Sequence, residues 1–185
     1  IFDLTKEKYS QMVDIESTSL LSTCGIIQIG ACRYNVAEKK TFDHLNLTID
    51  LSDLYKYECF EHDPETLTWW KNQSPEVKKA VLTGKMPIAS ALTEFENWVD
   101  RRYSICAYGY LDLPSLQYAF NKVLGHKEPW NHNKVLDLRT LLLLSGGYQA
   151  DEKSLARETK HIALADAISQ CEVIFELLGE EERTE

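Results

Sequence analysis

The sequence predicts a mixed α/β domain in which helices flank a five-stranded sheet. Three observations lead to this fold class. Strand-like apolar patterning fills the first third of the chain, helical spacing begins near residue 63, and two short apolar segments interrupt the later helices. The chain has 185 residues, of which 44% are hydrophobic, and this is enough to bury one core. We therefore expect residues 1–185 to form a single domain whose acidic tail at 180–185 frays.

The expected strands are segments of alternating or continuous apolar character. The first three cover residues 9–16, 25–35 and 41–50, and the third ends in apolar and polar residues that alternate with a period of two. A short polar turn at 37–40 indicates that neighbouring strands are antiparallel. Two further strands are expected at 104–108 and 135–138.

Helix boundaries are marked by capping residues. Asp63 before Pro64, and Ser74 before Pro75, each place an N-cap side chain ahead of a proline at the first helical position. Gly125 is expected to end a helix over 114–124, and another helix covers 139–144 up to a glycine pair at 146–147. Two more helices follow from apolar residues at helical spacing, namely Ile88, Leu92, Phe95 and Val99 in one and Ile168, Cys171, Phe175 and Leu178 in the other.

The charge balance limits the classes of partner. With 20 basic and 29 acidic residues the formal net charge is −9, which argues against a protein that holds nucleic acid on a broad basic surface. A polyanion would have to be bound locally, for example through metal ions. No apolar stretch approaches the ~20 residues of a membrane helix, and the first residues lack the pattern of a signal peptide. We therefore expect no membrane contact and a cytoplasmic location.

The cysteines and histidines give no zinc-binding pattern. The five cysteines are odd in number and widely spaced, and no two of them form a Cys-x-x-Cys pair. The five histidines supply no matching spacing. Free thiols in a reducing compartment are the expected state.

Two acids near the end of the first strand are the first candidates for chemistry. Asp14 and Glu16 are two residues apart, so the period of a strand places both on one face. Their neighbours Met12, Val13 and Ile15 indicate a buried strand, where paired carboxylates are costly without metal or protonation. The alternative is an exposed strand end with two solvated acids.

Three further polar residues each have an ordinary interpretation when taken alone. Asp112 follows a buried strand and precedes a helix, where it would serve as a helix cap. His161 and Asp166 stand at the approach to the last helix and in its first turns, where a surface role is the simple interpretation.

Taken together, these five residues are a more specific signal. The order Asp-x-Glu, Asp, His-x₄-Asp resembles that of the DEDDh family of 3′-to-5′ exonucleases, and the resemblance runs from about residue 10 to residue 178. It implies an RNase H-like fold, whose five-stranded mixed sheet has three antiparallel strands followed by two parallel ones. One departure is Leu111, which stands before Asp112 where many members have phenylalanine.

Two segments point to a subgroup. Residues 63–76, which contain Trp69 and Trp70, resemble a segment of phage exodeoxyribonuclease A and of the mycobacterial exoribonuclease that groups with it. The stretch Asp137-Leu138-Arg139-Thr140 is similar to the Asp-x-Arg-Thr segment of the same subgroup, with Asp137 supporting the site without being a ligand. This resemblance implies the cytoplasm of a bacterium or of a phage-infected host.

The resemblance also implies a mechanism. Asp14, Glu16, Asp112 and Asp166 would hold two Mg²⁺ ions, for which Mn²⁺ could substitute. Asp14 would bridge both ions, Glu16 and Asp166 would complete one shell, and Asp112 would reach the second ion through water. His161 would be the general base.

The implied reaction is hydrolysis at the 3′ ends of single-stranded nucleic acid, with release of nucleoside 5′-monophosphates. DNA is slightly favoured and RNA is possible. The candidate substrate contacts are Ser17, Thr18, Trp69, Trp70, Gly109, Tyr110 and Arg139, with Phe60 as a further ring that could stack on a base.

The two tryptophans also have a packing interpretation. Neighbours on a helix diverge by about 100°, so we expect at least one of them to pack in the core and the two not to face the same groove. An exposed tryptophan could instead contribute to a homodimer.

Two other classes of function are weighed against the exonuclease. A catalytically silent nucleic-acid-binding or adaptor module on the same fold has no chemical need for four convergent acids. A two-carboxylate glycoside hydrolase needs a separated acid and base and no four-acid cluster.

Overall fold

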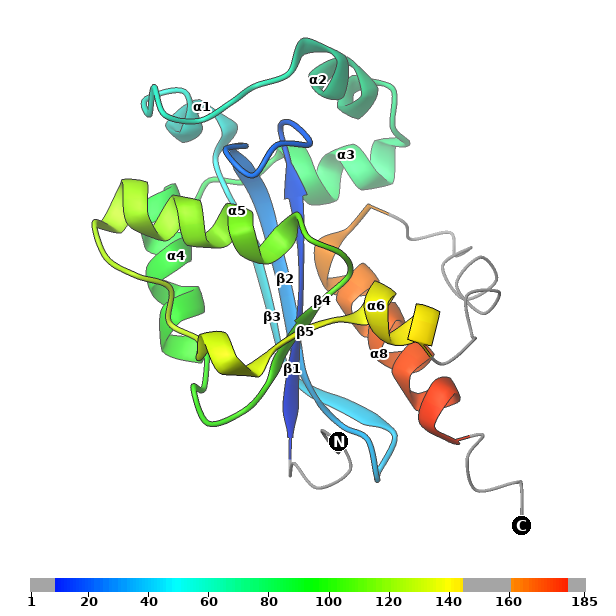
Figure 1. Cartoon of the computed structure of the whole chain (residues 1–185). Coiled ribbons are helices and arrows are strands. Elements are labelled where there is room, and N and C mark those ends of the chain that lie inside the picture. The colour runs from blue at the N-terminus through cyan, green and yellow to red at the C-terminus, as the bar shows by residue number, and fades with distance from the viewer. Residues whose placement is uncertain (1–8, 145–160, 180–185) are drawn as a thin grey trace.

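The computed structural model describes residues 9–144 and 161–179, which form a central sheet with helices on both sides (Figure 1). The strand order is β3-β2-β1-β4-β5. β2 pairs with β1 and β3 in antiparallel fashion, whereas β4 is parallel to β1 and to β5. This confirms the expected mixed sheet. The strand bounds are β1 Ser10–Ser17, β2 Ile26–Asn35, β3 Lys40–Thr48, β4 Ile105–Ala107 and β5 Val135–Asp137.

The helices divide between the two faces of the sheet. α4 and α5 lie on one side, and α6 and α8 lie on the other (Figure 1). The bounds are α1 Leu51–Leu54, α2 Pro64–Lys71, α3 Pro75–Leu82, α4 Ile88–Trp98, α5 Asp112–Ala119, α6 Leu138–Leu144 and α8 Ala163–Gly179, with a π-helical turn at Phe120–Leu124 and a 3₁₀ turn at His132–Lys134. The glycine pair expected to end α6, the acidic tail and the side chain of Leu178 lie outside the described residues.

The capping residues act as the sequence indicates. Asp63 accepts hydrogen bonds from the backbone N–H groups of Glu65 and Thr66, and Ser74 accepts one from Val77. Gly125 adopts the left-handed conformation, with φ of 72°, directly after the π-helical turn. These contacts explain why α2 and α3 begin, and why the helical segment before Gly125 ends, at the predicted residues.

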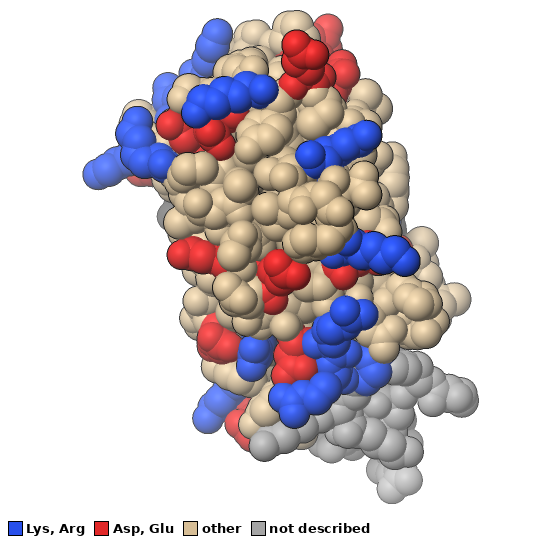
Figure 2. All heavy atoms as spheres, turned by 90° about the vertical axis from the view of Figure 1, so that its left-hand side faces the viewer, with Lys and Arg blue, Asp and Glu red and all other residues tan. Residues whose placement is uncertain are grey.

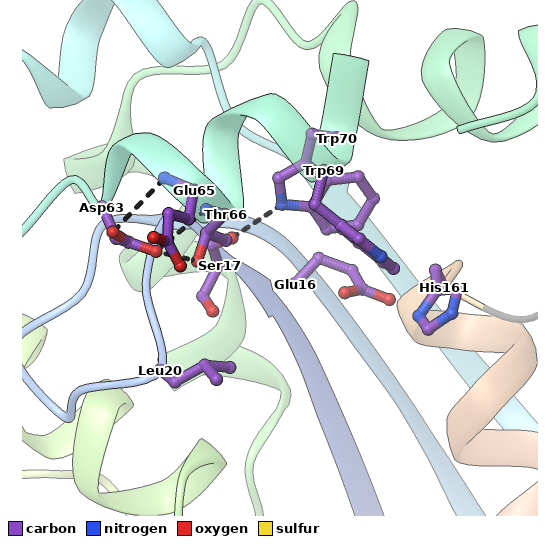
Figure 3. A pocket seen from close by; sticks show the side chains of 9 residues that line it. All are labelled: Glu16, Ser17, Leu20, Asp63, Glu65, Thr66, Trp69, Trp70 and His161. Atoms are coloured by element: carbon purple, nitrogen blue, oxygen red, sulfur yellow. Dashed lines mark hydrogen bonds between the residues drawn. The ribbon is translucent and has the colours of Figure 1, made fainter. Parts of the chain in front are cut away.

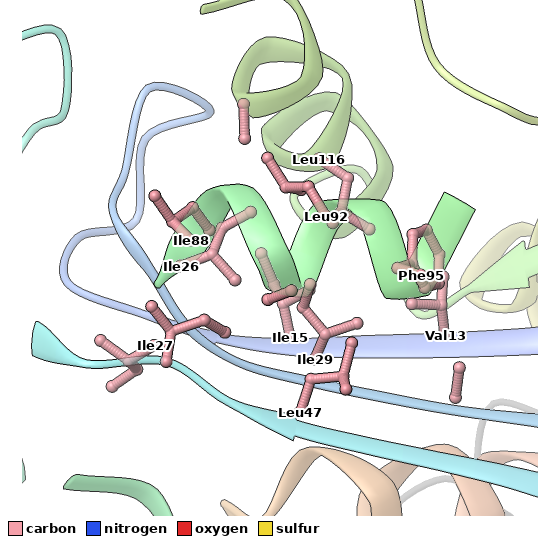
Figure 4. Close-up of a cluster of buried hydrophobic side chains, with 14 of the residues drawn as sticks. Val13, Ile15, Ile26, Ile27, Ile29, Leu47, Ile88, Leu92, Phe95 and Leu116 are labelled. Carbon is pink, nitrogen blue, oxygen red and sulfur yellow. The ribbon is translucent and has the colours of Figure 1, made fainter. Parts of the chain in front are cut away.

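Two apolar clusters, one on each face of the sheet, form the core. On the α4 and α5 side, Val13 and Ile15 of β1 pack with Ile29, Leu92 and other buried side chains (Figure 4). On the α6 and α8 side, Met12 belongs to the second cluster. The alternation along β1 therefore places residues 12, 14 and 16 toward α8.

Several predicted boundaries were wrong. α1 was not expected, because four residues are too few for a helical pattern. β4 pairs only over Ile105–Ala107 and not over the whole of 104–108. α5 begins at Asp112 itself, and α4 ends at Trp98, so that Val99 follows it in an extended conformation.

The surface on the side of α4 and α5 carries basic and acidic side chains that are interspersed (Figure 2). On this face, basic side chains therefore do not form the one-signed surface with which proteins bind long nucleic acids. Among the described helices, none combines the length and the apolar composition that spanning a lipid bilayer requires.

Candidate active site

The two acids of β1 face the start of α8. Asp14 Oδ1 accepts a hydrogen bond of 2.7 Å from Gln170 Nε2 of that helix. Glu16, which is 9% exposed, lies beside His161 and Asp166, and one ligand atom from each of these three side chains lies within 4.8 Å of the others. The prediction that Asp14 and Glu16 share a face is therefore confirmed, and solvated acids at an exposed strand end are excluded.

The strand next to β1 holds α8 in place. Gly30 pairs with Asp14 and Gln28 pairs with Glu16 in the antiparallel ladder. Gln28 Oε1 accepts a hydrogen bond of 2.9 Å from the backbone N–H of Ala163. A Cβ atom on Gly30 would lie only 2.0 Å from the backbone nitrogen of Leu164. The start of α8 thus rests directly on the backbone of β2, beside the two acids.

His161 precedes α8 in the left-handed conformation, with φ of 69°, which histidine tolerates better than most residues. Its backbone N–H donates a hydrogen bond of 2.8 Å to Asp166 Oδ2. Its ring meets the ring of Trp69 edge to face, with centroids 4.6 Å apart. These contacts place the imidazole at the edge of the acidic cluster.

Asp112 is not a helix cap. It is the first residue of α5, and Leu111 stands at the N-cap position without a side-chain hydrogen bond. Asp112 Oδ1 instead accepts a hydrogen bond of 3.0 Å from the backbone N–H of Ile15, between the two acids of β1. The capping interpretation was wrong because this carboxylate bonds to a strand distant in sequence.

The four acids repel one another. Burial, followed by the charges of Asp112, Glu16 and Asp166, raises the pKa of Asp14 well above its usual value. Burial and the neighbouring charges of Asp166 and Asp112 raise the pKa of Glu16 to about 8. Burial raises the pKa of Asp112 to about 6 even though the Ile15 hydrogen bond opposes it. The cluster therefore favours either protonation or a bound cation.

The donor set fits hard divalent cations. Carboxylate oxygens from β1, α5 and α8 converge on one place, and an imidazole lies beside them. Oxygen ligands of this kind suit Mg²⁺ and Mn²⁺. Bound cations would also relieve the repulsion that raises the pKa of Asp14 and Glu16.

The metal-free protein is expected to become more stable as the pH is lowered from 8 to 5.5. A carboxyl group whose pKa is raised by folding destabilises the folded state fully above the folded pKa, which is about 8 for Glu16. This penalty fades as the pH falls toward the unfolded value. In EDTA, the thermal unfolding midpoint should be at least about 3 °C higher at pH 5.5 than at pH 8, and added Mg²⁺ should raise it more at pH 8.

The Asp14→Asn variant separates this effect from other titrations. Burial lowers the pKa of His62, so its protonation opposes the trend below about pH 6.5. The variant retains His62 but loses one of the four charges, so its midpoint should depend less on pH. Equal pH dependence in the two proteins would contradict the repulsion argument.

Two pockets meet at the acidic cluster. A pocket of about 530 Å³ is lined by Glu16, His161, the two tryptophans and residues from the start of α2 (Figure 3). A second pocket of about 400 Å³ is lined by Asp14, Asp112, Arg139 and the loop before α5. Leu20, which is 75% exposed, lines both pockets. Three of the four acids therefore line one or the other of two pockets that share Leu20.

One tryptophan is buried and the other is exposed, but both line the larger pocket. Trp70 is 2% exposed and its Nε1–H donates to the carbonyl of Ser17 at 2.9 Å, which confirms that one ring packs in the core. Trp69 is 41% exposed. Both nevertheless line the larger pocket, and their ring centroids lie 4.8 Å apart with the planes at 76°. The expectation that they could not share a groove was wrong.

Four of the other predicted substrate contacts line a pocket, and Thr18 does not. Ser17 lines the larger pocket, and Gly109, Tyr110 and Arg139 line the smaller one. Thr18 is fully buried and lines neither pocket, because its hydroxyl donates to the carbonyl of Glu61 and accepts from the N–H of Gly25.

Two further predictions concern residues beside the site. Phe60 is buried in the core, so it is not a ring that stacks on a base. Asp137 accepts hydrogen bonds from the backbone N–H groups of Gly109 and Arg139, which agrees with a supporting position near the site. The Arg139 guanidinium lies over the Tyr108 ring, 4.7 Å from its centroid.

Sequence reasoning missed two residues. Leu20 follows the first strand in a polar loop, and nothing in its pattern separates it from an ordinary exposed leucine. Gln170 is four residues after Asp166, which puts both on one face of a helix. That spacing is the signal that could have found it.

A family model described as the 3′-5′ exoribonuclease Rv2179c-like domain matches residues 9–178. The comparison with curated proteins found no match.

Solved exonucleases share the fold. The nuclease domain of 3′hExo, a DEDDh family member bound to rAMP, is 11% identical with a TM-score of 0.64, and the match covers 95% of this chain and 94% of that one. S. pombe Pop2p in a form with bound Mg²⁺ and Mn²⁺ is 11% identical with a TM-score of 0.61, covering 91% and 82%. The zinc-bound E. coli ExoI–ssDNA complex is 12% identical with a TM-score of 0.69, and this chain, covered over 96%, spans 42% of that protein. The fold is thus the RNase H-like exonuclease fold.

Proposed function

Since the chain belongs to the family of Rv2179c-like 3′-5′ exoribonuclease domains, we propose that it removes nucleotides from the 3′ ends of single-stranded nucleic acid with the help of two divalent cations. The observation that carries this proposal is the convergence of four carboxylates and an imidazole, most of which line two pockets that share Leu20.

Asp14, Glu16, Asp112 and Asp166 would hold the cations, with Asp14 shared between them. When bound, the cations would activate water and neutralise charge on the scissile phosphate. The chain contributes rigidity to this site. Asp112 is anchored to the backbone of β1 and Asp166 to the backbone of His161, so two of the four carboxylates are oriented before substrate arrives.

His161 is the proposed general base. Its ring is held between the acidic cluster and the edge of Trp69, and an imidazole accepts a proton readily near neutral pH. A ring nitrogen of His161 would take a proton from the attacking water and pass it to solvent. The bond between phosphorus and the 3′ oxygen of the preceding nucleotide would break, and that oxygen would take up a proton from solvent. The products would be a nucleoside 5′-monophosphate and a strand shortened by one nucleotide.

The two pockets suggest how the substrate lies. We place the 3′-terminal nucleoside in the larger pocket, against Trp69, because its exposed ring offers a sequence-tolerant stacking surface. The preceding nucleotide would lie in the smaller pocket, beside Tyr110 and Arg139. No carboxylate of the described residues is recorded in an ion pair with Arg139, so its guanidinium can meet a phosphate of the strand.

Replacing Trp69 with alanine should weaken substrate binding more than it slows chemistry. Loss of one base–aromatic stack is worth ~1–3 kcal/mol, so we expect KM for a single-stranded oligonucleotide to rise about tenfold. We expect kcat to fall by a smaller factor, because the same ring also contacts His161. Trp69→Phe, which retains an aromatic ring, is the matched control. Steady-state kinetics would contradict this placement if both variants had the wild-type KM.

The choice between RNA and DNA is tested together with the activity itself. The family description supports RNA, and the likeness of residues 63–76 to a phage exodeoxyribonuclease supports DNA. Oligoribonucleotides and oligodeoxyribonucleotides of one sequence, labelled at the 5′ or 3′ end, would be incubated with Mg²⁺, Mn²⁺ or EDTA. A metal-dependent ladder that shortens from the 3′ end establishes the exonuclease and its preferred sugar.

The same experiment tests the silent module. Intact oligonucleotides under every condition, together with Mg²⁺-dependent thermal stabilisation, would favour a binding or adaptor protein. The Asp14→Asn variant, carried through the same purification, excludes contamination by another nuclease.

The free cysteines bear on the cellular location, and the position of Trp69 bears on assembly. All five cysteines are free, which supports a reducing, cytoplasmic compartment. Because Trp69 lines the larger pocket, we assign it to substrate in preference to a homodimer contact. Light scattering of wild type and Trp69→Ala would test that choice.

A further inference from the structure

Gln170 is an exception on the buried face of α8. The side chains that this helix turns toward the sheet include Ala163, Ala167, Cys171 and Ile174, and each is at most 1% exposed. Gln170 lies among them and is only 3% exposed. Burying an amide in such surroundings costs stability unless it is hydrogen-bonded.

The amide is only half satisfied. Gln170 Nε2 donates a hydrogen bond of 2.7 Å to Asp14 Oδ1, whereas Gln170 Oε1 is buried with no hydrogen-bond partner among the described residues. A side chain needed only for packing would be better as methionine or leucine, since neither leaves a buried oxygen unpaired. The contact with Asp14 is therefore the feature that explains glutamine at this position.

We propose that Gln170 is a positioning residue that orients Asp14 for cation binding. Its N–H occupies one lone pair of Oδ1, which leaves Oδ2 and the second lone pair of Oδ1 for cations. An uncharged donor suits this task, because a lysine at the same place would compete with the cations as a counter-ion. The role rests on the proposed function, since it has a purpose only if Asp14 is a ligand.

The position of Gln170 on α8 supports this role. It lies one turn after Asp166, so a single helix carries one proposed ligand and the group that orients another. The same helix is fixed to β2 through Ala163. α8 thus links the orientation of Asp14 on β1 to the position of Asp166.

The test compares Gln170→Met and Gln170→Leu, which remove the donor and retain an apolar side chain of similar size. Ser169→Ala is the matched control, because Ser169 is a buried polar neighbour on the same turn and is 6% exposed. Mn²⁺ affinity is measured by titration calorimetry without substrate, and thermal unfolding is measured in EDTA. Kinetic assays at varied Mg²⁺ accompany them.

We expect both Gln170 variants to bind Mn²⁺ about tenfold more weakly, within the range of about 10–100-fold found for groups that orient metal ligands. Their unfolding midpoints in EDTA should stay close to that of the wild type, because removal of the unpaired oxygen offsets the loss of the hydrogen bond to Asp14. The rate lost at low Mg²⁺ should be partly recovered at high Mg²⁺, and KM for the oligonucleotide should change little. Ser169→Ala should retain the wild-type affinity.

The possible failures are distinguishable. If wild type binds Mn²⁺ and either folded Gln170 variant binds it equally well, the positioning role is overturned while the proposed function stands. A lower midpoint in EDTA with unchanged affinity would also overturn it, because that result describes a packing residue. If wild type neither binds Mn²⁺ nor shortens oligonucleotides, the proposed function fails, and the role of Gln170 fails with it.

Discussion

Replacing Asp14 with asparagine is expected to reduce turnover by at least ~10³-fold, a loss of the size seen when one member of a catalytic unit is removed. Asp14 interacts electrostatically with Asp112, Glu16 and Asp166, so its loss removes the acid that the charges of the other three surround. Asparagine retains the shape and can still contact Gln170, so the fold should remain intact. Initial rates on a labelled oligonucleotide at saturating Mg²⁺ measure the loss.

A second measurement on the same variant distinguishes lost ligation from lost structure. Because the variant removes one of four mutually repelling charges, its unfolding midpoint in EDTA at pH 8 should equal or exceed that of the wild type. Glu94→Gln on the exposed face of α4 is the control, and it should match the wild type in rate and midpoint. Wild-type rates in Asp14→Asn would exclude the two-cation proposal.

The second large effect is expected at His161. Asparagine is the informative replacement, because it tolerates the left-handed backbone conformation, with φ of 69°, better than alanine does. Loss of the general base should lower kcat by about 10²-fold or more.

Cation binding should be affected far less than the rate. Calorimetric titration with Mn²⁺ should give an affinity for His161→Asn within about threefold of wild type, because the four acids remain. His132→Gln on the exposed 3₁₀ turn controls for the loss of a histidine as such. If His161→Asn instead lost Mn²⁺ affinity in proportion to its rate, His161 would be a ligand and not a base.

Local rules predicted the parts of the site that lie within single elements. The period of a strand was sufficient to put Asp14 and Glu16 on one face, and both side chains do face α8. Capping chemistry located the start of α2, which carries both tryptophans. Such patterns depend on residues a few positions apart, so one sequence contains them.

Contacts between distant segments were not predictable in the same way. Asp112 has the sequence environment of a cap, but the backbone of Ile15, 97 residues away, determines its role. Gln170 meets Asp14 across 156 residues. Thr18 was expected at the substrate, yet its hydroxyl joins Gly25 and Glu61. In each case the partner is set by tertiary packing, for which the local pattern gives no signal.

Gly30 fixes the distance between the sheet and the start of α8. Gly30 of β2 pairs with Asp14 of β1. The backbone of Ala163 and Leu164 occupies the space that a side chain at Gly30 would need. The backbone of α8 therefore packs directly on the backbone of β2. No side-chain rotamer at this contact can change the distance between the strand that carries Asp14 and the helix that carries Asp166. A single methyl group at Gly30 would force the start of α8 away from β2, and with it Asp166 away from Asp14.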